Sequence, residues 1–132
     1  MDKVISAESS LNEWGKSAGD KDFGTAATRA AKATRDSLNE YDFKENLQDS
    51  ITRLSSTFAN AFGGTSGPMW QAFMSGGAIK LKKKMSENTD LNWTAAYAEG
   101  LKALQEVPGA TKGQGTIVDA LKGGMEYMKT LD

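Results

Sequence analysis

The sequence predicts an all-α fold, an antiparallel up-and-down bundle or barrel of about six helices. Apolar residues recur at intervals of three and four in every long segment, which is the period of an amphipathic helix. Sustained alternation and Asn-Gly hairpin signals, which would indicate strands, are missing. With 132 residues and no low-complexity linker, residues 1–132 are expected to form a single helical domain with its own core.

The first predicted helix carries apolar residues at Val4, Ala7, Leu11 and Trp14, spaced by three and four. The second covers the alanine-rich segment 26–33, whose small side chains would let a neighbouring helix approach closely. We interpret the tryptophan and methionine positions of the chain as core positions.

The third and fourth predicted helices have recognisable starts. Asp42 and Glu45 have the spacing of an N-terminal capping pair. Ser66 is expected to cap the fourth helix, with Pro68 in its first turn. The apolar faces of these two helices comprise Leu47, Ile51, Leu54, Phe58 and Phe62, and then Trp70, Met74, Gly77 and Leu81.

The fifth predicted helix starts at Asp90 or Asn92 and stops at Pro108-Gly109. Thr116 and Asp119 form a second capping pair, which predicts the start of the sixth helix. The apolar faces comprise Trp93, Tyr97, Leu101 and Leu104, and then Ile117, Leu121, Met125 and Met128.

The composition narrows the possible chemistry. The chain has no cysteine and no histidine, so a metal ion would be held by oxygen ligands, which favours magnesium, calcium or manganese. Sixteen basic and seventeen acidic residues give a formal net charge of -1, which does not favour a nucleic-acid partner. No apolar run approaches the roughly 20 residues of a membrane span. The N-terminus lacks the apolar segment of a signal peptide, so a cytoplasmic location is expected, with a secreted form that has lost its leader as the alternative.

Three glycine-bearing junctions, at residues 19–24, 63–68 and 109–116, are the main functional signal. Each precedes a predicted helix, namely the second, the fourth and the sixth. In an up-and-down bundle these three joints lie at the same end, so three helix N-termini would converge there. Helix N-termini carry partial positive charge and free N–H donors, and this end is therefore a predicted site for an anion such as phosphate.

Asp20 and Asp22 in the first junction are candidate metal ligands. They lie two residues apart in a glycine-flanked turn, and magnesium is commonly bound by one or two carboxylates together with phosphate oxygens. The alternative is that these aspartates have only a local structural role, because aspartate is favoured at a helix start as a capping residue.

The second junction is the candidate phosphate site, with Gly64, Thr65, Ser66 and Gly67 as its binding residues. Successive glycines leave backbone N–H groups unshielded and allow positive φ, and the two hydroxyls add donors. The alternative is a glycine C-cap followed by a serine N-cap, which leaves Gly67 without a role.

The third junction contributes Thr116 as a candidate binding residue. Lys112 could bind a phosphate through its positive charge, but a lysine in such a position more often faces water. We interpret Arg29 and Arg35 as surface residues of the second predicted helix.

Together the three segments resemble the ATP-binding L-type domain, or L subunit, of the dihydroxyacetone kinase family. In that family three turns open the second, fourth and sixth helices, and they read Gly-Asp-Xxx-Asp-His-Gly, Gly-Gly-Ala-Ser-Gly-Pro and Gly-Asp-Lys-Thr-Met-Xxx-Asp-Ala. The matching segments here are residues 19–24, 63–68 and 113–120, in the same order, so the resemblance spans nearly the whole chain.

The resemblance implies a closed barrel of antiparallel helices, eight in the family, in which two magnesium ions bridge the nucleotide phosphates to aspartates. Asp20 and Asp22 fall on two of the three metal-ligand aspartates of the family. The turn 64–66 falls on the phosphate-contacting segment, and Thr116 and Asp119 fall on the third motif.

The chain also departs from the family pattern. The first family aspartate aligns with Gly15, the histidine with Phe23, and the Asp-Lys of the third motif with Gln114 and Gly115. The chain stops after the sixth predicted helix, so the last two helices of the family are expected to be missing. In the family, a separate K-type domain holds the acceptor sugar through a histidine, a residue that this chain lacks.

The sequence therefore predicts a shortened, degenerate L-type domain that binds Mg²⁺ with ATP or ADP weakly, or another phosphate-bearing ligand. Little or no kinase activity is expected from the chain alone, and no catalytic residue is assigned. The alternative is a binding protein for a lipid or other apolar ligand, because the loss of two helices would open the barrel interior. Self-association as a homodimer and a regulatory interaction module are further alternatives.

Overall fold

The computed structural model describes residues 1–17, 22–88, 93–110 and 117–131. Within these ranges all regular structure is helical, which confirms the all-α prediction. The α-helices are α1 (Asp2–Ser6), α2 (Glu8–Ser17), α3 (Phe23–Ser37), α4 (Leu47–Phe62), α5 (Ser66–Ala78), α6 (Trp93–Gln105) and α7 (Ile117–Thr130). Two short 3-10 segments, η1 (Leu38–Glu40) and η2 (Met85–Glu87), follow α3 and α5. No helix in the described part of the chain is both long and apolar enough to cross a membrane.

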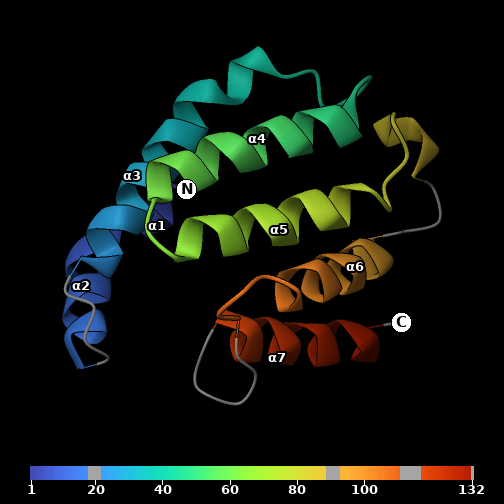
Figure 1. Cartoon of the computed structure of the whole chain (residues 1–132). Coiled ribbons are helices and arrows are strands. Elements are labelled where there is room, and N and C mark those ends of the chain that lie inside the picture. Colours follow the sequence, from blue (N-terminus) through green and yellow to red (C-terminus); the bar gives the residue numbers. More distant parts are fainter. Residues whose placement is uncertain (18–21, 89–92, 111–116, 132) are drawn as a thin grey trace.

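Helices that are neighbours in the sequence are also neighbours in space. From α3 to α6, each helix packs against the one before it and the one after it, and α7 packs against α6. Helices α4 to α7 run back and forth (Figure 1). The two short N-terminal helices pack against α3. The arrangement is the predicted up-and-down one, in which every second connection lies on the same side.

The first predicted helix is divided in two. Ala7 has φ -94° and ψ 5° and separates α1 from α2, so the structure has seven described α-helices where about six were predicted. Val4 and Leu11 still pack into the core, but Trp14 is 69% exposed. The core position that we predicted for Trp14 is wrong, because α2 packs mainly against α3 and the opposite side of α2 faces solvent.

The predicted helix starts are displaced by short distances. The Glu45 N–H donates to Asp42 Oδ1 at 3.1 Å, but this pair closes a turn before α4, which starts at Leu47. Ser66 is the first residue of α5 and not its cap, and Pro68 lies in the first turn as predicted. The predicted starts at Asp90, Asn92 and Thr116 fall outside the described residues.

The core consists of three clusters of buried apolar residues. One joins α6 to α7, and a second joins α3 to the end of α4. A third joins the start of α4 to the segment after α5 and to the first turn of α6. Their buried members are Leu101, Leu104, Val118 and Met125; Ala27, Ala30 and Phe62; and Leu47, Leu81 and Ala96.

Small residues bring the helices into close contact, as predicted for the alanine-rich segment. Ala30 and Ala31 of α3 are fully buried. A Cβ atom added at Gly24 would overlap the Glu8 carbonyl oxygen of α2. Gly77 of α5 lies against α6, where an added Cβ would be 2.9 Å from the Ala96 carbonyl oxygen. Backbone-to-backbone approaches of this kind leave no room for a larger side chain.

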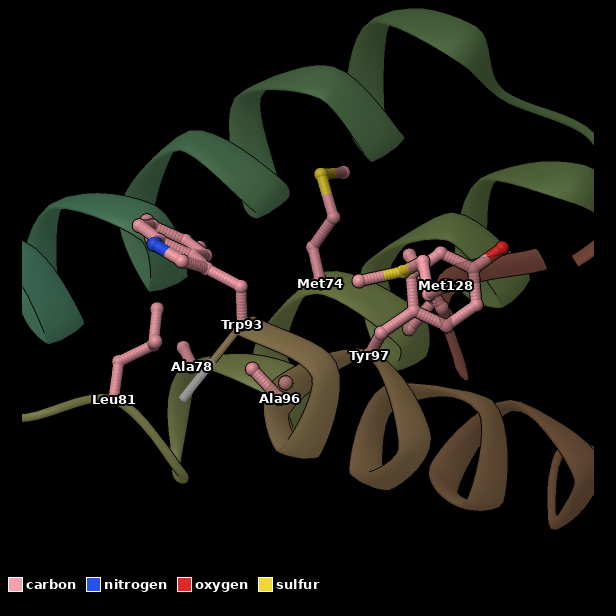
Figure 2. Close-up of a pocket in the computed structure, with 10 residues that line it drawn as sticks. Met74, Ala78, Leu81, Trp93, Ala96, Tyr97 and Met128 are labelled. Carbon is pink, nitrogen blue, oxygen red and sulfur yellow. The ribbon is translucent and has the colours of Figure 1, made fainter. Parts of the chain in front are cut away.

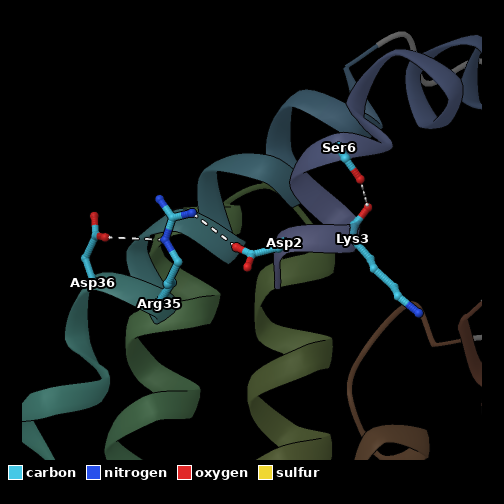
Figure 3. A network of polar contacts seen from close by, with 5 residues as sticks. All are labelled: Asp2, Lys3, Ser6, Arg35 and Asp36. Carbon is cyan, nitrogen blue, oxygen red and sulfur yellow. Dashed lines mark hydrogen bonds and ion pairs between the residues drawn. The ribbon is translucent and has the colours of Figure 1, made fainter.

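An exposed ionic contact joins α1 to the last turns of α3 (Figure 3). Arg35 Nη1 lies 3.3 Å from Asp2 Oδ1, and Arg35 Nε lies 3.7 Å from Asp36 Oδ1. Both carboxylates are more than two-thirds exposed, so these pairs add little to stability. The prediction that Arg35 lies at the surface is confirmed.

Tyr97 links α6 to α7 inside the first cluster. Its hydroxyl donates to the Leu121 carbonyl oxygen at 2.8 Å, and its ring packs edge-on against Phe73 with 5.1 Å between centroids. Burial raises the pKa of the Tyr97 hydroxyl above its ordinary value of 10.0.

Replacing Tyr97 with phenylalanine should lower the free energy of unfolding at pH 7 by about 1 kcal/mol, because the hydrogen bond to Leu121 is lost. Because the pKa is raised, the contribution of Tyr97 to the free energy of unfolding also depends on pH. The neutral tyrosine contributes stability that is fully present below pH 10.0 and is lost as the pH rises through the folded-state pKa. Urea unfolding between pH 7 and pH 11 should therefore show a steeper loss of stability at alkaline pH in the wild type than in Tyr97→Phe.

Tyr127→Phe, at a 65% exposed site, is the control. Equal alkaline profiles for wild type and Tyr97→Phe would contradict this reading.

Candidate functional site

The turn between α4 and α5 has the backbone geometry predicted for a phosphate-binding segment. Gly63 and Gly64 have φ values of 72° and 62°, in the left-handed region that favours glycine. The Gly63 N–H closes α4 by donating to Ala59 O at 3.0 Å, and the Gly67 N–H donates to Gly63 O at 3.1 Å. The turn therefore connects two helix ends within three residues.

Thr65 and Ser66 place two hydroxyl groups at the N-terminus of α5. Thr65 occupies the cap position, but its side chain makes no capping hydrogen bond. Both residues line two neighbouring cavities, one toward α3 and one toward α7. The start of a 13-residue helix, which carries partial positive charge, and two residues with hydroxyl groups thus border the same space.

Asp22 lies on the opposite wall of the first cavity. It is exposed and occupies the position before α3, where its side chain makes no capping hydrogen bond. The cavity encloses about 260 Å³ and is lined by Asp22, Ala26, Arg29, Phe62, Gly63, Gly64, Thr65 and Ser66. The structure therefore brings Asp22 and the glycine turn, which are more than forty positions apart in the sequence, to one cavity.

The second cavity connects the starts of three helices. It encloses about 520 Å³ and is lined by Phe23, Thr65, Ser66, Met69, Trp70, Ile117, Ala120 and Leu121. Its lining includes the first residues of α3, α5 and α7, and Figure 1 shows α5 and α7 beginning on the same side. For the described residues, the predicted convergence of three helix N-termini is confirmed.

Several predicted site residues cannot be placed. Asp20, Lys112 and Thr116 lie outside the described residues. Within the described ranges, no group of three or more acidic residues lies close enough together to hold a metal ion. Asp22 is thus the one predicted metal ligand whose position the structure describes.

Gly67 has a packing role that sequence reasoning did not find. The residue is buried, and a Cβ added there would lie 2.7 Å from the Ala59 carbonyl oxygen. Glycine at this position lets the first turn of α5 pass directly against the last turns of α4. This packing against Ala59 accounts for Gly67, to which the cap interpretation of the junction gave no role.

Arg29 is the residue of this site that the sequence interpretation missed. It is exposed on α3, as expected for a surface residue, but its Nε donates to Ala61 O and its Nη2 donates to Phe62 O at 2.9 Å. The sequence does indicate which face of α3 carries Arg29, because it follows Asp22 by seven residues, or two helical turns, but it does not indicate the partners on α4.

Two further cavities have apolar linings. The larger encloses about 490 Å³ between α1, α2, α3, α4 and α5, and its walls are wholly apolar. The smaller, of about 230 Å³, is bordered by Met74, Trp93 and Met128 (Figure 2). Phe73 and Met74 line both, so the two cavities are neighbours.

Comparison with known proteins identifies the class to which these features belong. Residues 17–132 match the DAK2 domain, and the chain belongs to this domain family of the dihydroxyacetone kinases. A triokinase/FMN cyclase from Rattus norvegicus is 36% identical over 119 residues, which is 89% of this chain and 20% of that protein. A dihydroxyacetone kinase from Komagataella pastoris is 30% identical over 138 residues, 98% of this chain and 22% of that protein.

A putative 3,4-dihydroxy-2-butanone kinase from Solanum lycopersicum is 27% identical over 128 residues, 96% of this chain and 22% of that protein. The chain thus spans about a fifth of the length of these curated relatives. No solved structure matches the chain.

Proposed function

We propose that this chain is an L-type, nucleotide-binding domain that binds the phosphates of a magnesium nucleotide at the turn between α4 and α5. The observation that carries the proposal is the cavity of about 260 Å³ between Asp22 and the segment 63–66. Two of the relatives are named as kinases. Kinases transfer phosphoryl groups, so these names agree with a phosphate-binding site at this end of the helices.

The roles follow from the chemistry of the lining. The backbone N–H groups of Gly64, Thr65 and Ser66 suit phosphate oxygens, and the Thr65 and Ser66 hydroxyls add two donors. Asp22, with Asp20 next to it in the sequence motif, supplies the carboxylate oxygens that Mg²⁺ prefers. Phosphate binding at such a site depends on positioning and on neutralising charge.

Catalysis by the chain alone is not part of the proposal. The resemblance assigns three aspartates to a two-magnesium site, and Gly15 stands where the first would be. A site with fewer carboxylates holds its metal more weakly. The chain also has no histidine with which to hold an acceptor sugar in the manner of the family. We therefore propose weak nucleotide binding with little or no kinase activity of the chain alone.

The larger apolar cavity favours a second candidate function. A cavity of about 490 Å³ with wholly apolar walls suits a lipid tail or another apolar ligand. Its lining includes Phe58, Phe62 and Trp70, which give a large apolar contact area.

One calorimetric experiment separates the two candidates. Titration with magnesium-ADP and magnesium-ATP should give a Kd of about 1 mM, equivalent to about -4 kcal/mol. Adenosine, which has no phosphate, should give no heat and is the control. A long-chain fatty acid forms the second arm, and tight binding in that arm alone would favour the apolar function. The absence of nucleotide heat at millimolar concentrations would overturn the first proposal.

A further inference from the structure

Arg29 joins α3 to the last turn of α4. Its Nε donates to the Ala61 carbonyl oxygen, and its Nη2 donates to the Phe62 carbonyl oxygen at 2.9 Å. Ala61 and Phe62 are the last two residues of α4, and Gly63 follows them directly. A guanidinium group is planar and presents several donors in a fixed fork, so it can hold two consecutive carbonyls at once.

The electrostatics of a helix end favour this contact. The last carbonyl groups of a helix lack intrahelical partners and carry partial negative charge. Arg29 supplies both donors and a permanent positive charge at this point. The guanidinium also lies against the turn itself, because a Cβ added at Gly63 would be 3.8 Å from Arg29 Nη2.

The same helix carries the proposed metal ligand. Asp22 lies at the start of α3 and Arg29 lies two turns later, and both line the cavity of about 260 Å³. The distance between the Asp22 carboxylate and the glycine turn is therefore set by how α3 is fastened to the end of α4. Apolar packing around Phe62 provides one part of this connection, and the hydrogen bonds from Arg29 provide another.

We propose that Arg29 is a positioning residue of the nucleotide site, which fixes the turn from Gly63 to Ser66 opposite Asp22. The inference rests on the proposed function, because the turn matters for a ligand only if phosphate binds there. In this reading Arg29 does not transfer a proton or a phosphoryl group. It orients the backbone N–H groups that would receive the phosphate.

Arg35 provides a matched comparison on the same helix. It is also an exposed arginine of α3, but it pairs with Asp2 and Asp36 at the other end of the helix, away from the turn (Figure 3). Removing either arginine changes the net charge by the same amount. A difference between the two variants therefore reports the contact with α4 and not the loss of a positive charge.

The test uses Arg29→Ala, Arg29→Lys and Arg35→Ala, at a temperature at which all are fully folded. Nuclear magnetic resonance measures amide hydrogen exchange at Gly63 and Gly67, whose N–H groups are hydrogen-bonded in the turn. Arg29→Ala should speed both exchange rates about tenfold and should weaken magnesium-ADP binding about tenfold. Arg29→Lys should recover only part of each loss, because an ammonium group cannot span two carbonyls as a fork. Arg35→Ala should change neither quantity.

The outcomes distinguish the inference from the proposed function. If the wild type binds no magnesium-ADP, the proposed function fails, whereas faster exchange in Arg29→Ala still supports Arg29 as the residue that holds the turn. If the wild type binds magnesium-ADP, and Arg29→Ala speeds amide exchange without changing the affinity for magnesium-ADP, Arg29 is only a helix cap. The inference is then overturned. Unchanged exchange in Arg29→Ala overturns it as well.

Discussion

Replacing Gly24 with alanine should destabilise the protein by about 3 kcal/mol, the upper part of the usual range for overpacking a core. The added Cβ would overlap the Glu8 carbonyl oxygen and lie 2.8 Å from the Asn12 backbone nitrogen. Both atoms belong to the backbone of α2, so no rotation of a side chain can relieve the overlap. The melting temperature, followed by circular dichroism, should fall by about 10 °C.

Gly123→Ala is the control for this change. Gly123 also lies within a helix, but nothing stands within 4 Å of its added Cβ. Alanine is the better helix former, so this variant should gain about 0.5–1 kcal/mol. Equal stability of Gly24→Ala and the wild type would mean that α2 and α3 do not approach as closely as described.

Replacing Asp22 with asparagine should weaken magnesium-dependent nucleotide binding at least tenfold, a loss of about 1.4 kcal/mol. The amide keeps the shape of the side chain but removes the negative charge that attracts a divalent cation. Calorimetry with ADP in the presence and absence of magnesium measures the effect. The part of the affinity that depends on magnesium should fall, and binding without magnesium should change little.

Asp36→Asn tests whether a general loss of negative charge explains such a result. Asp36 is another exposed aspartate of α3, and it lies beside Arg35, far from the glycine turn. This variant should bind magnesium-ADP as the wild type does. If Asp22→Asn also binds normally, Asp22 has a local role at the start of α3 and is not a metal ligand.

The periodicity of apolar residues predicted the fold class because the helices are amphipathic and pack mainly on one side. The division at Ala7 could not be predicted in this way. Alanine favours a helix, and nothing in the local sequence indicates a break. Both α1 and α2 pack against α3, and the spacing of apolar residues does not report this tertiary arrangement.

Sequence reasoning identified the site residues whose role depends on local backbone conformation. It missed the roles that depend on contacts with residues far away in the chain. Gly63 and Gly64 were identified because successive glycines favour positive φ, and both have it. The packing role of Gly67 depends on how closely α5 approaches Ala59, which is a property of the pair of helices. Arg29 bonds to a carbonyl 32 positions away, and no local pattern reports such a partner.

The succession of helices, each packed against its neighbours in the chain, has a consequence for how the polypeptide reaches this shape. Most tertiary interactions join segments close together in the sequence, so the entropy lost on closing loops is small. Low contact order of this kind goes with folding in microseconds to milliseconds. Packing of one helix pair therefore closes only a short loop, and the next helix along the chain can then join it at a similarly small entropic cost.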